Sequence, residues 1–143
     1  MPKDLGIHKS NFIACSANPN AVYRLAGEPL AVAGFEDRPT VLQGASNPDA
    51  PLVLMFHGSN GCIANFQSRS DLDAIASRNG VSIVWLSGKP LPTRNWNVNG
   101  YCCGEAARLK VDDLAYVDAV MRAVHAQGLR PRSEEHTSEL QSR

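Results

Sequence analysis

Residues 51–61 read PLVLMFHGSNG, an uninterrupted apolar run that passes through a histidine into a short polar turn bounded by glycines. The run at residues 52–56 has no polar alternation, which is typical of a strand buried on both faces of a parallel sheet. Ligand sites in such sheets lie beyond the carboxyl ends of the strands. The small residues of the turn leave backbone N–H groups accessible to a ligand at this end. This junction indicates acyl-transfer chemistry, in which such groups stabilise an oxyanion.

The segment after the turn predicts a helix and a second strand. Its apolar residues recur at intervals typical of one helix: Phe66, Leu72, Ile75 and Ala76. Asn79 and Gly80 form a capping pair that ends this helix. Residues 81–86 form another apolar run, which predicts a buried strand. A strand, a helix and a strand with short joints make a right-handed βαβ unit, so the two strands pair in parallel.

The rest of the chain has weaker patterns, with one exception. Residues 87–104 lack any period and predict a long irregular loop. Asp112 and Asp113 then begin an amphipathic helix that ends at Gly128, and their carboxylates complement the helix dipole and cap its N–H groups. The apolar stripe of this helix comprises Leu114, Val117, Val120, Met121 and Val124. Residues 30–33 and 40–42 predict short strands within a poorly patterned segment, residues 1–50. The predicted fold class is α/β, with a mostly parallel sheet and flanking helices.

Size and composition exclude several classes of protein. A chain of 143 residues builds one domain, and its formal net charge of zero gives no electrostatic footprint for nucleic acid or an anionic membrane. No apolar stretch has the length of a membrane span, and no signal peptide is visible at the N-terminus. The sequence does not indicate the cellular compartment. The four cysteines have no zinc-site spacing, and we expect neither a metal nor a cofactor.

The C-terminal segment, residues 132–143, reads RSEEHTSELQSR and breaks the α/β rhythm. Its first eleven residues resemble the in-frame translation of a common sequencing-library adapter. We therefore expect this segment to be an adapter-derived artefact without ordered structure, and we exclude it from the fold prediction. The domain prediction is then a poorly matched segment at residues 1–50, an α/β part at residues 51–131, and the artefact.

Several motifs in residues 51–131 together resemble one family. In order, they are the HGSNG turn, Trp96-Asn97, Cys102-Cys103-Gly104 and Val111-Asp112-Asp113. In this combination the chain resembles the polyhydroxybutyrate depolymerase and feruloyl esterase group of α/β-hydrolases. The resemblance implies a truncated α/β-hydrolase whose catalytic serine, aspartate and histidine would follow Pro131. No G-x-S-x-G elbow occurs in this chain, so we expect no catalytic triad residue in it.

The resemblance and the residues give a candidate site. Ser59 is expected to supply a backbone N–H to the oxyanion hole, while His57, Gly58 and Gly61 shape the turn. Trp96 and Asn97 either line a substrate cleft or, for the tryptophan, cover the edge of the core. A disulfide between Cys62 and either Cys102 or Cys103 would tie the turn to the tryptophan loop.

The predicted function is that of a fragment of a carboxylic ester hydrolase. Its substrate class would be polyhydroxyalkanoate, feruloyl or acetyl esters, as small molecules or polymers, and the chain alone would be inactive. One alternative is a non-catalytic α/β module whose tryptophan loop binds a polymer or sugar. Another is a nucleotide-binding domain, which the absence of phosphate-loop motifs disfavours. In the hydrolase fold the nucleophile strand pairs beside residues 52–56, so we expect aggregation or dimerisation through this unpaired edge.

Overall fold

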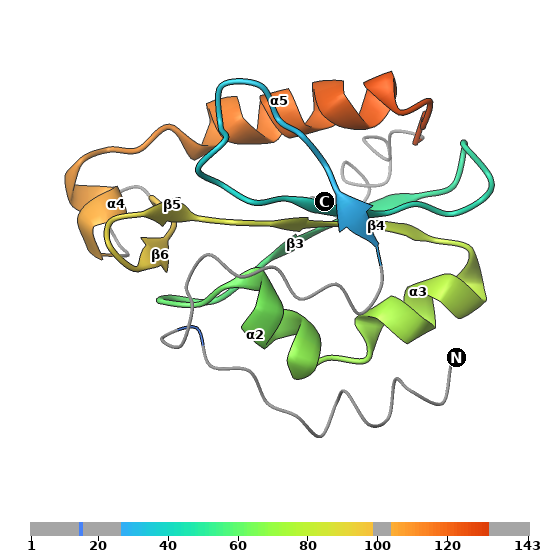
Figure 1. The fold of residues 1–143 in the computed structure, drawn as a ribbon, viewed down its shortest axis with the longest axis horizontal. Helices are drawn as coiled ribbons and strands as arrows, with labels where there is room; N and C mark the ends of the chain where they lie inside the picture. Colours follow the sequence, from blue (N-terminus) through green and yellow to red (C-terminus); the bar gives the residue numbers. More distant parts are fainter. Residues whose placement is uncertain (1–14, 16–26, 99–103, 132–143) are drawn as a thin grey trace, which may run out of the picture.

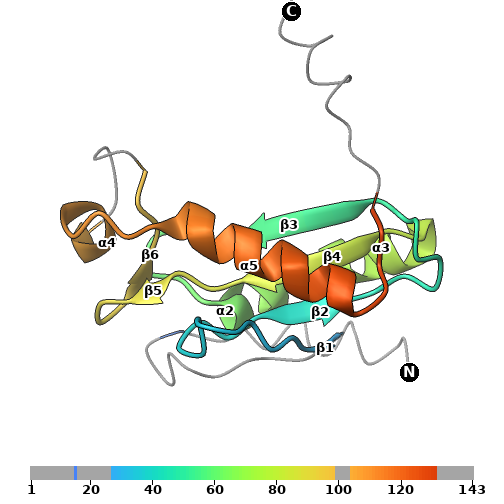
Figure 2. The same ribbon diagram turned by 90° about the horizontal axis from the view of Figure 1, so that it is seen from above.

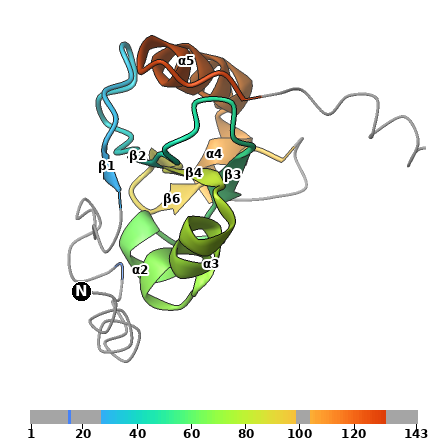
Figure 3. The ribbon, with the colours of Figure 1, turned by 90° about the vertical axis from the view of Figure 1, so that its right-hand side faces the viewer.

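The computed structural model describes Cys15, residues 27–98 and residues 104–131. These residues form three layers, with α5 on one face of the main sheet and α2 and α3 on the other (Figures 1 and 3). The strands are β1 Glu28–Pro29, β2 Val41–Gln43, β3 Leu52–Phe56, β4 Ser82–Leu86, β5 Lys89–Pro90 and β6 Arg94–Asn95. The helices are α2 Ile63–Ser68, α3 Leu72–Asn79, α4 Gly104–Arg108 and α5 Asp113–Ala126. The layering confirms an α/β class.

The main sheet is mixed, with strand order β1-β2-β4-β3. β3 and β4 pair in parallel, with Leu52 opposite Ser82 and Phe56 opposite Leu86, which confirms the predicted parallel pair. β2 is antiparallel to both β1 and β4. The prediction of a mostly parallel sheet is therefore wrong, because only one of the three strand pairs in this sheet, β3 with β4, is parallel.

β4 is the centre of the core, and every one of its residues is buried. Its side chains alternate between two apolar clusters, since Val84 and Leu86 pack toward α5 while Ile83 and Trp85 pack on the other face. β3 lies at the edge of the sheet (Figure 2). The prediction that both of its faces are buried is wrong, because Val53 is 42 % exposed and Phe56 is 46 % exposed. A strand with one neighbour receives less cover from the flanking helices than a central strand.

The segment after β3 forms two helices where the periodicity predicted one. Helix α2 ends at Ser68 and α3 begins at Leu72. Between them the Ser70 hydroxyl accepts a hydrogen bond from the Leu72 N–H at 3.0 Å, which offers the backbone an alternative to a continuous helix. The predicted cap is confirmed, since Gly80 adopts a left-handed φ of 65° at the end of α3.

Helix α5 begins where the aspartate pair predicted it. The Asp112 carboxylate accepts a hydrogen bond from the Ala115 N–H at 3.0 Å and so caps the helix. Its buried residues are Tyr116, Ala119, Val120 and Val124. The predicted stripe is wrong at Leu114, which is 78 % exposed, because the core-facing stripe is centred on Tyr116.

Residues 87–104 contain more regular structure than predicted. β5 and β6 form a short antiparallel hairpin, and α4 begins at Gly104. Residues 99–103 lie outside the described residues. Of the two weak strand predictions, residues 40–42 overlap β2, whereas residues 30–33 follow β1 and contribute Leu30 and Val32 to the core as a loop.

Residues 132–143, predicted to be an artefact, lie outside the described residues, as do residues 1–14 and 16–26. Within the described ranges, every helix is too short or too polar to cross a lipid bilayer.

Candidate functional site

The candidate site is the turn at residues 58–61, between the carboxyl end of β3 and the start of α2. The Gly61 N–H donates to the Gly58 carbonyl at 3.0 Å, which closes the turn. Asn60, at the third position, has a left-handed φ of 57°, as in turns of type II. A Cβ on Gly61 would approach the Gly58 oxygen to 2.8 Å, so the tight turn requires glycine at this position.

Asn95 on β6 holds this turn in place. Its Oδ1 accepts hydrogen bonds from the Ser59 hydroxyl at 2.7 Å and from the Asn60 N–H at 3.0 Å. Its Nδ2 donates to the Asn60 Oδ1 at 2.8 Å. Asn95 is not indicated by the sequence pattern, although its neighbours Trp96 and Asn97 are candidates. No local spacing identifies it, because its partners lie 35 and 36 residues earlier.

The hydrogen bonds leave two N–H groups of the turn, those of Gly58 and Ser59, without an acceptor among the described residues. The N–H groups of Asn60 and Gly61 are both donated within the site. Within residues 27–98 and 104–131 we find no acceptor for the Ser59 N–H. The Ser59 hydroxyl is donated to Asn95, which makes it a turn constraint rather than an accessible nucleophile. This geometry suits a backbone donor at Ser59.

His57 is buried, and both of its ring nitrogens are engaged. Nδ1 lies 2.8 Å from the Gly58 carbonyl, which only accepts, so Nδ1 carries the proton. Nε2 accepts the Gly88 N–H at 3.0 Å. Burial, together with the charges of Arg94 and Arg38, lowers the pKa of His57, against the opposing effect of the bond to Gly58. A neutral imidazole with no spare nitrogen braces the turn and does not act as a general base.

Trp96 covers the end of β3 beside the turn. Its indole N–H donates to the His57 carbonyl at 2.8 Å. Its ring lies 5.0 Å from the Phe56 ring in an edge-on arrangement and 5.1 Å from the His57 ring. Trp96 also packs against the core cluster under α5. These contacts place the side chain at the edge of the core, directly beside the turn.

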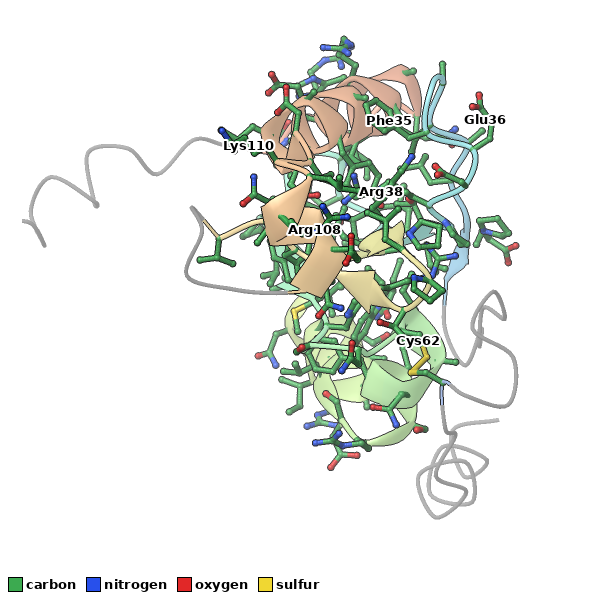
Figure 4. The ribbon with its side chains drawn as sticks, turned by 90° about the vertical axis from the view of Figure 1, so that its left-hand side faces the viewer. Phe35, Glu36, Arg38, Cys62, Arg108 and Lys110 are labelled. Carbon is green, nitrogen blue, oxygen red and sulfur yellow. A yellow bond between two sulfur atoms is a disulfide. The ribbon has the colours of Figure 1, made fainter. Side chains whose placement is uncertain are left out.

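A buried charged network links this layer to α5. Arg38, close to the start of α5 (Figure 4), pairs its Nη2 with the Asp113 carboxylate at 2.6 Å and donates from Nε to the Ser87 carbonyl at 2.9 Å. The other carboxylate oxygen of Asp113 accepts the Asn97 N–H at 2.7 Å. The guanidinium carbon lies 3.9 Å from the centre of the Tyr116 ring. Asp113 therefore anchors the Trp96–Asn97 segment, a role beyond complementing the helix dipole.

A hollow of about 200 Å³ opens beside the turn, lined by His57, Gly58, Asn65, Phe66 and Arg69. It is smaller than the cavities of about 300–1,000 Å³ that hold most small ligands. A larger hollow of about 550 Å³ is formed by residues 29–40 and includes none of the turn residues. The hollow beside the turn is therefore too small to hold a typical small ligand by itself, and it could form only part of a binding site.

The prediction that Cys62 forms a disulfide with Cys102 or Cys103 is wrong. Cys62, the residue before α2, is bonded to Cys15, with their Cα atoms 5.8 Å apart (Figure 4). A cysteine forms one disulfide, so Cys62 is not paired with Cys102 or Cys103, which lie outside the described residues. The prediction failed because the partner, Cys15, belongs to the N-terminal segment, whose position relative to α2 the sequence pattern does not indicate. The start of α2 is thus tied to that segment and not to the tryptophan loop.

Within the described residues, no group of histidine, cysteine, aspartate and glutamate side chains has an arrangement that could hold a metal ion. Comparisons with protein-family models, with curated proteins and with solved structures find no match for this chain.

Proposed function

We propose that this chain is the N-terminal part of a serine esterase of the α/β-hydrolase fold, acting on carboxylic esters through an acyl-enzyme. The observation that carries the proposal is the turn at residues 58–61. It places the Ser59 N–H, without an acceptor among the described residues, at the carboxyl end of a parallel strand. Catalysis of acyl transfer needs such donors held rigidly before the oxyanion forms. Asn95 and His57 supply this rigidity.

The free edge of β3 also supports the proposal. The resemblance to polyhydroxybutyrate depolymerases and feruloyl esterases implies that the nucleophile strand pairs beside β3. In the described part of the chain, β3 pairs only with β4, and its outer edge faces no strand. A strand added there would end beside the turn, since neighbouring parallel strands end at the same edge of a sheet. Its serine would then face the Ser59 N–H.

The chain by itself should not hydrolyse esters. The Ser59 hydroxyl and both nitrogens of His57 are already engaged in hydrogen bonds, with Asn95, Gly58 and Gly88. The catalytic serine, aspartate and histidine belong to the part that would follow Pro131. Polyhydroxyalkanoate and feruloyl or acetyl esters remain the substrate classes of the proposal, and its chemistry needs no cofactor.

The binding-module alternative has less support. A tryptophan that stacks on a sugar presents a free ring face. The Trp96 ring instead contacts Phe56 and His57, and the Arg38 guanidinium lies 5.6 Å from its centre. Its indole N–H is also donated to the backbone.

The test begins with the uninterrupted reading frame on both sides of residues 1–131. Its full product is incubated with a fluorescent serine-directed phosphonate. We expect labelling of one serine in a G-x-S-x-G elbow, and loss of labelling when that serine is replaced by alanine. An intact elbow that does not react, or a reading frame without an elbow, would refute the esterase proposal.

Ser59→Pro tests the turn in the full product. Proline suits the second position of a turn of this kind, and the substitution removes the N–H together with the hydroxyl that bonds Asn95. Relative to Ser59→Ala, we expect kcat to be lower by about 10²–10³, the usual loss for one oxyanion donor. Ser59→Ala is the matched control, because it removes the hydroxyl and keeps the N–H. Equal kcat values for the two variants would show that the Ser59 N–H is not an oxyanion donor.

A further inference from the structure

We propose that the outer edge of β3 is a self-association surface, at which a second copy of this chain adds its own β3 in antiparallel orientation with Leu54 on the two-fold axis. β3 is the last strand of the sheet, and no described strand lies on its outer side (Figure 2). Residues 51–56 carry no charged side chain. Long, uncharged edges without such protection are templates for pairing with another chain.

The backbone of β3 makes this edge symmetric. The Ser82 N–H donates to the Pro51 carbonyl at 2.9 Å, and Ser82 lies opposite Leu52. In a parallel pair this register turns the backbone groups of Pro51, Val53 and Met55 toward β4. Those of Leu52, Leu54 and Phe56 therefore point outward. In an antiparallel pair centred on Leu54, each outward residue meets an outward residue of the other copy.

The side chains beside the edge are equally self-complementary. An apolar groove of about 260 Å³ runs between β3 and α3. Its walls include Val53, Met55, Leu72 and Ile75, of which Ile75 is 42 % exposed. A two-fold axis perpendicular to the sheet places both grooves on the same side, with Val53 of one copy opposite Met55 of the other. The pair therefore covers exposed apolar surface in both copies.

The charges of α3 agree with this orientation. The helix carries the exposed Asp71 at its start and the exposed Arg78 in its last turn. Under the proposed axis the two copies of α3 run antiparallel. The Asp71 end of one then approaches the Arg78 end of the other, so unlike charges meet.

The opposite edge of the sheet explains why association should stop at two copies. That edge is β1, which consists only of Glu28 and Pro29. A charged residue and a proline on a short strand prevent further pairing. A chain with one open edge and one blocked edge closes as a dimer and does not extend into a fibre.

Sedimentation velocity over a range of concentrations of the whole chain tests the proposal. We expect a monomer–dimer equilibrium that shifts at least tenfold toward monomer in Val53→Lys. The matched control is Ala33→Lys, which adds the same charge at an exposed position beyond β1 and should leave the equilibrium unchanged. A monomer at all concentrations, open-ended oligomers, or equal effects of the two variants would overturn the proposal.

Cross-linking tests the register. Residues that exchange both hydrogen bonds in an antiparallel pair have Cα atoms about 5.5 Å apart, within the range for a disulfide. Leu54→Cys should therefore give a covalent dimer on mild oxidation, whereas Val53→Cys, which faces Met55, should not. Cross-linking of Val53→Cys as fast as Leu54→Cys would overturn the register, as would no covalent dimer from a folded Leu54→Cys. In the full product of the esterase proposal the nucleophile strand would occupy this edge, so the dimer is proposed for the 143-residue chain alone, whereas the esterase proposal depends on labelling of the full product.

Discussion

The two adjacent aspartates at the start of α5 allow a sharp test of the buried network. Asp113→Asn removes the charge that faces Arg38, whose side chain is only 1 % exposed. Breaking a buried ion pair by removing one partner costs about 3–5 kcal/mol. Asp113 is 14 % exposed, and asparagine keeps one acceptor oxygen, so we expect a loss of about 3 kcal/mol in the free energy of unfolding. This is a large fraction of the total of about 5–15 kcal/mol for a small domain.

Urea unfolding at pH 7, followed by circular dichroism, measures the effect. With a slope of about 2 kcal/mol per molar urea, the midpoint should fall by about 1.5 M. Asp112→Asn is the matched control, because asparagine caps a helix as well as aspartate does. Its midpoint should stay close to that of the parent chain. Equal midpoints for the two variants would refute the conclusion that Asp113 compensates the buried charge of Arg38.

The remaining predictions concern the residues that brace the turn. Burial lowers the pKa of His57 in the folded chain below its ordinary value of 6.5, so acid protonates this histidine in the unfolded chain first. The contribution of neutral His57 to stability is therefore complete above about pH 6.5 and declines as the pH falls toward the pKa of the folded state. A ¹⁵N NMR titration should show a neutral ring with the proton on Nδ1, and a ring already cationic at pH 6.5 would contradict this. Gly88→Ala should lower the free energy of unfolding by about 1–3 kcal/mol, because its Cβ would lie 2.5 Å from the Asn95 carbonyl oxygen. Gly58→Ala, whose Cβ meets nothing within 4 Å, should have little effect on the free energy of unfolding. Equal losses for Gly88→Ala and Gly58→Ala in the urea assay would show that close packing does not explain the effect at Gly88.

The elements that could be predicted from the sequence are those that depend only on residues close together in the chain. The apolar runs of β3 and β4, the cap at Gly80 and the start of α5 each depend on neighbours within a few positions. The exposure of Val53 could not be predicted in this way, because it depends on how many strands flank β3. The break before Leu72 results from a local competition between the Ser70 hydroxyl and the helix, which apolar spacing does not register.

The same limit applies to the candidate site. The position of the turn and the choice of Ser59 come from a local pattern, and the oxyanion role itself stays a prediction. Asn95 was missed because an asparagine in a loop of many polar residues has nothing to distinguish it until β6 is placed. The bridge from Cys62 to Cys15 was missed because sequence alone does not determine disulfide connectivity.

The hydrogen bonds of the turn have a consequence for the order of folding. The Asn95 amide contacts the turn, and the Gly88 N–H and the Trp96 indole contact His57 before it; these groups lie 31 to 39 residues after the groups that they contact. Loops of this length close after local helices and turns have formed, because closure entropy opposes the contact. The hydrogen bonds that brace the turn therefore form only when residues 88–96 dock, and a ribosome-bound chain ending before Asn95 lacks the bonds that hold Ser59 and Asn60. Trp96 fluorescence reports this step, since its indole joins the turn in the same event.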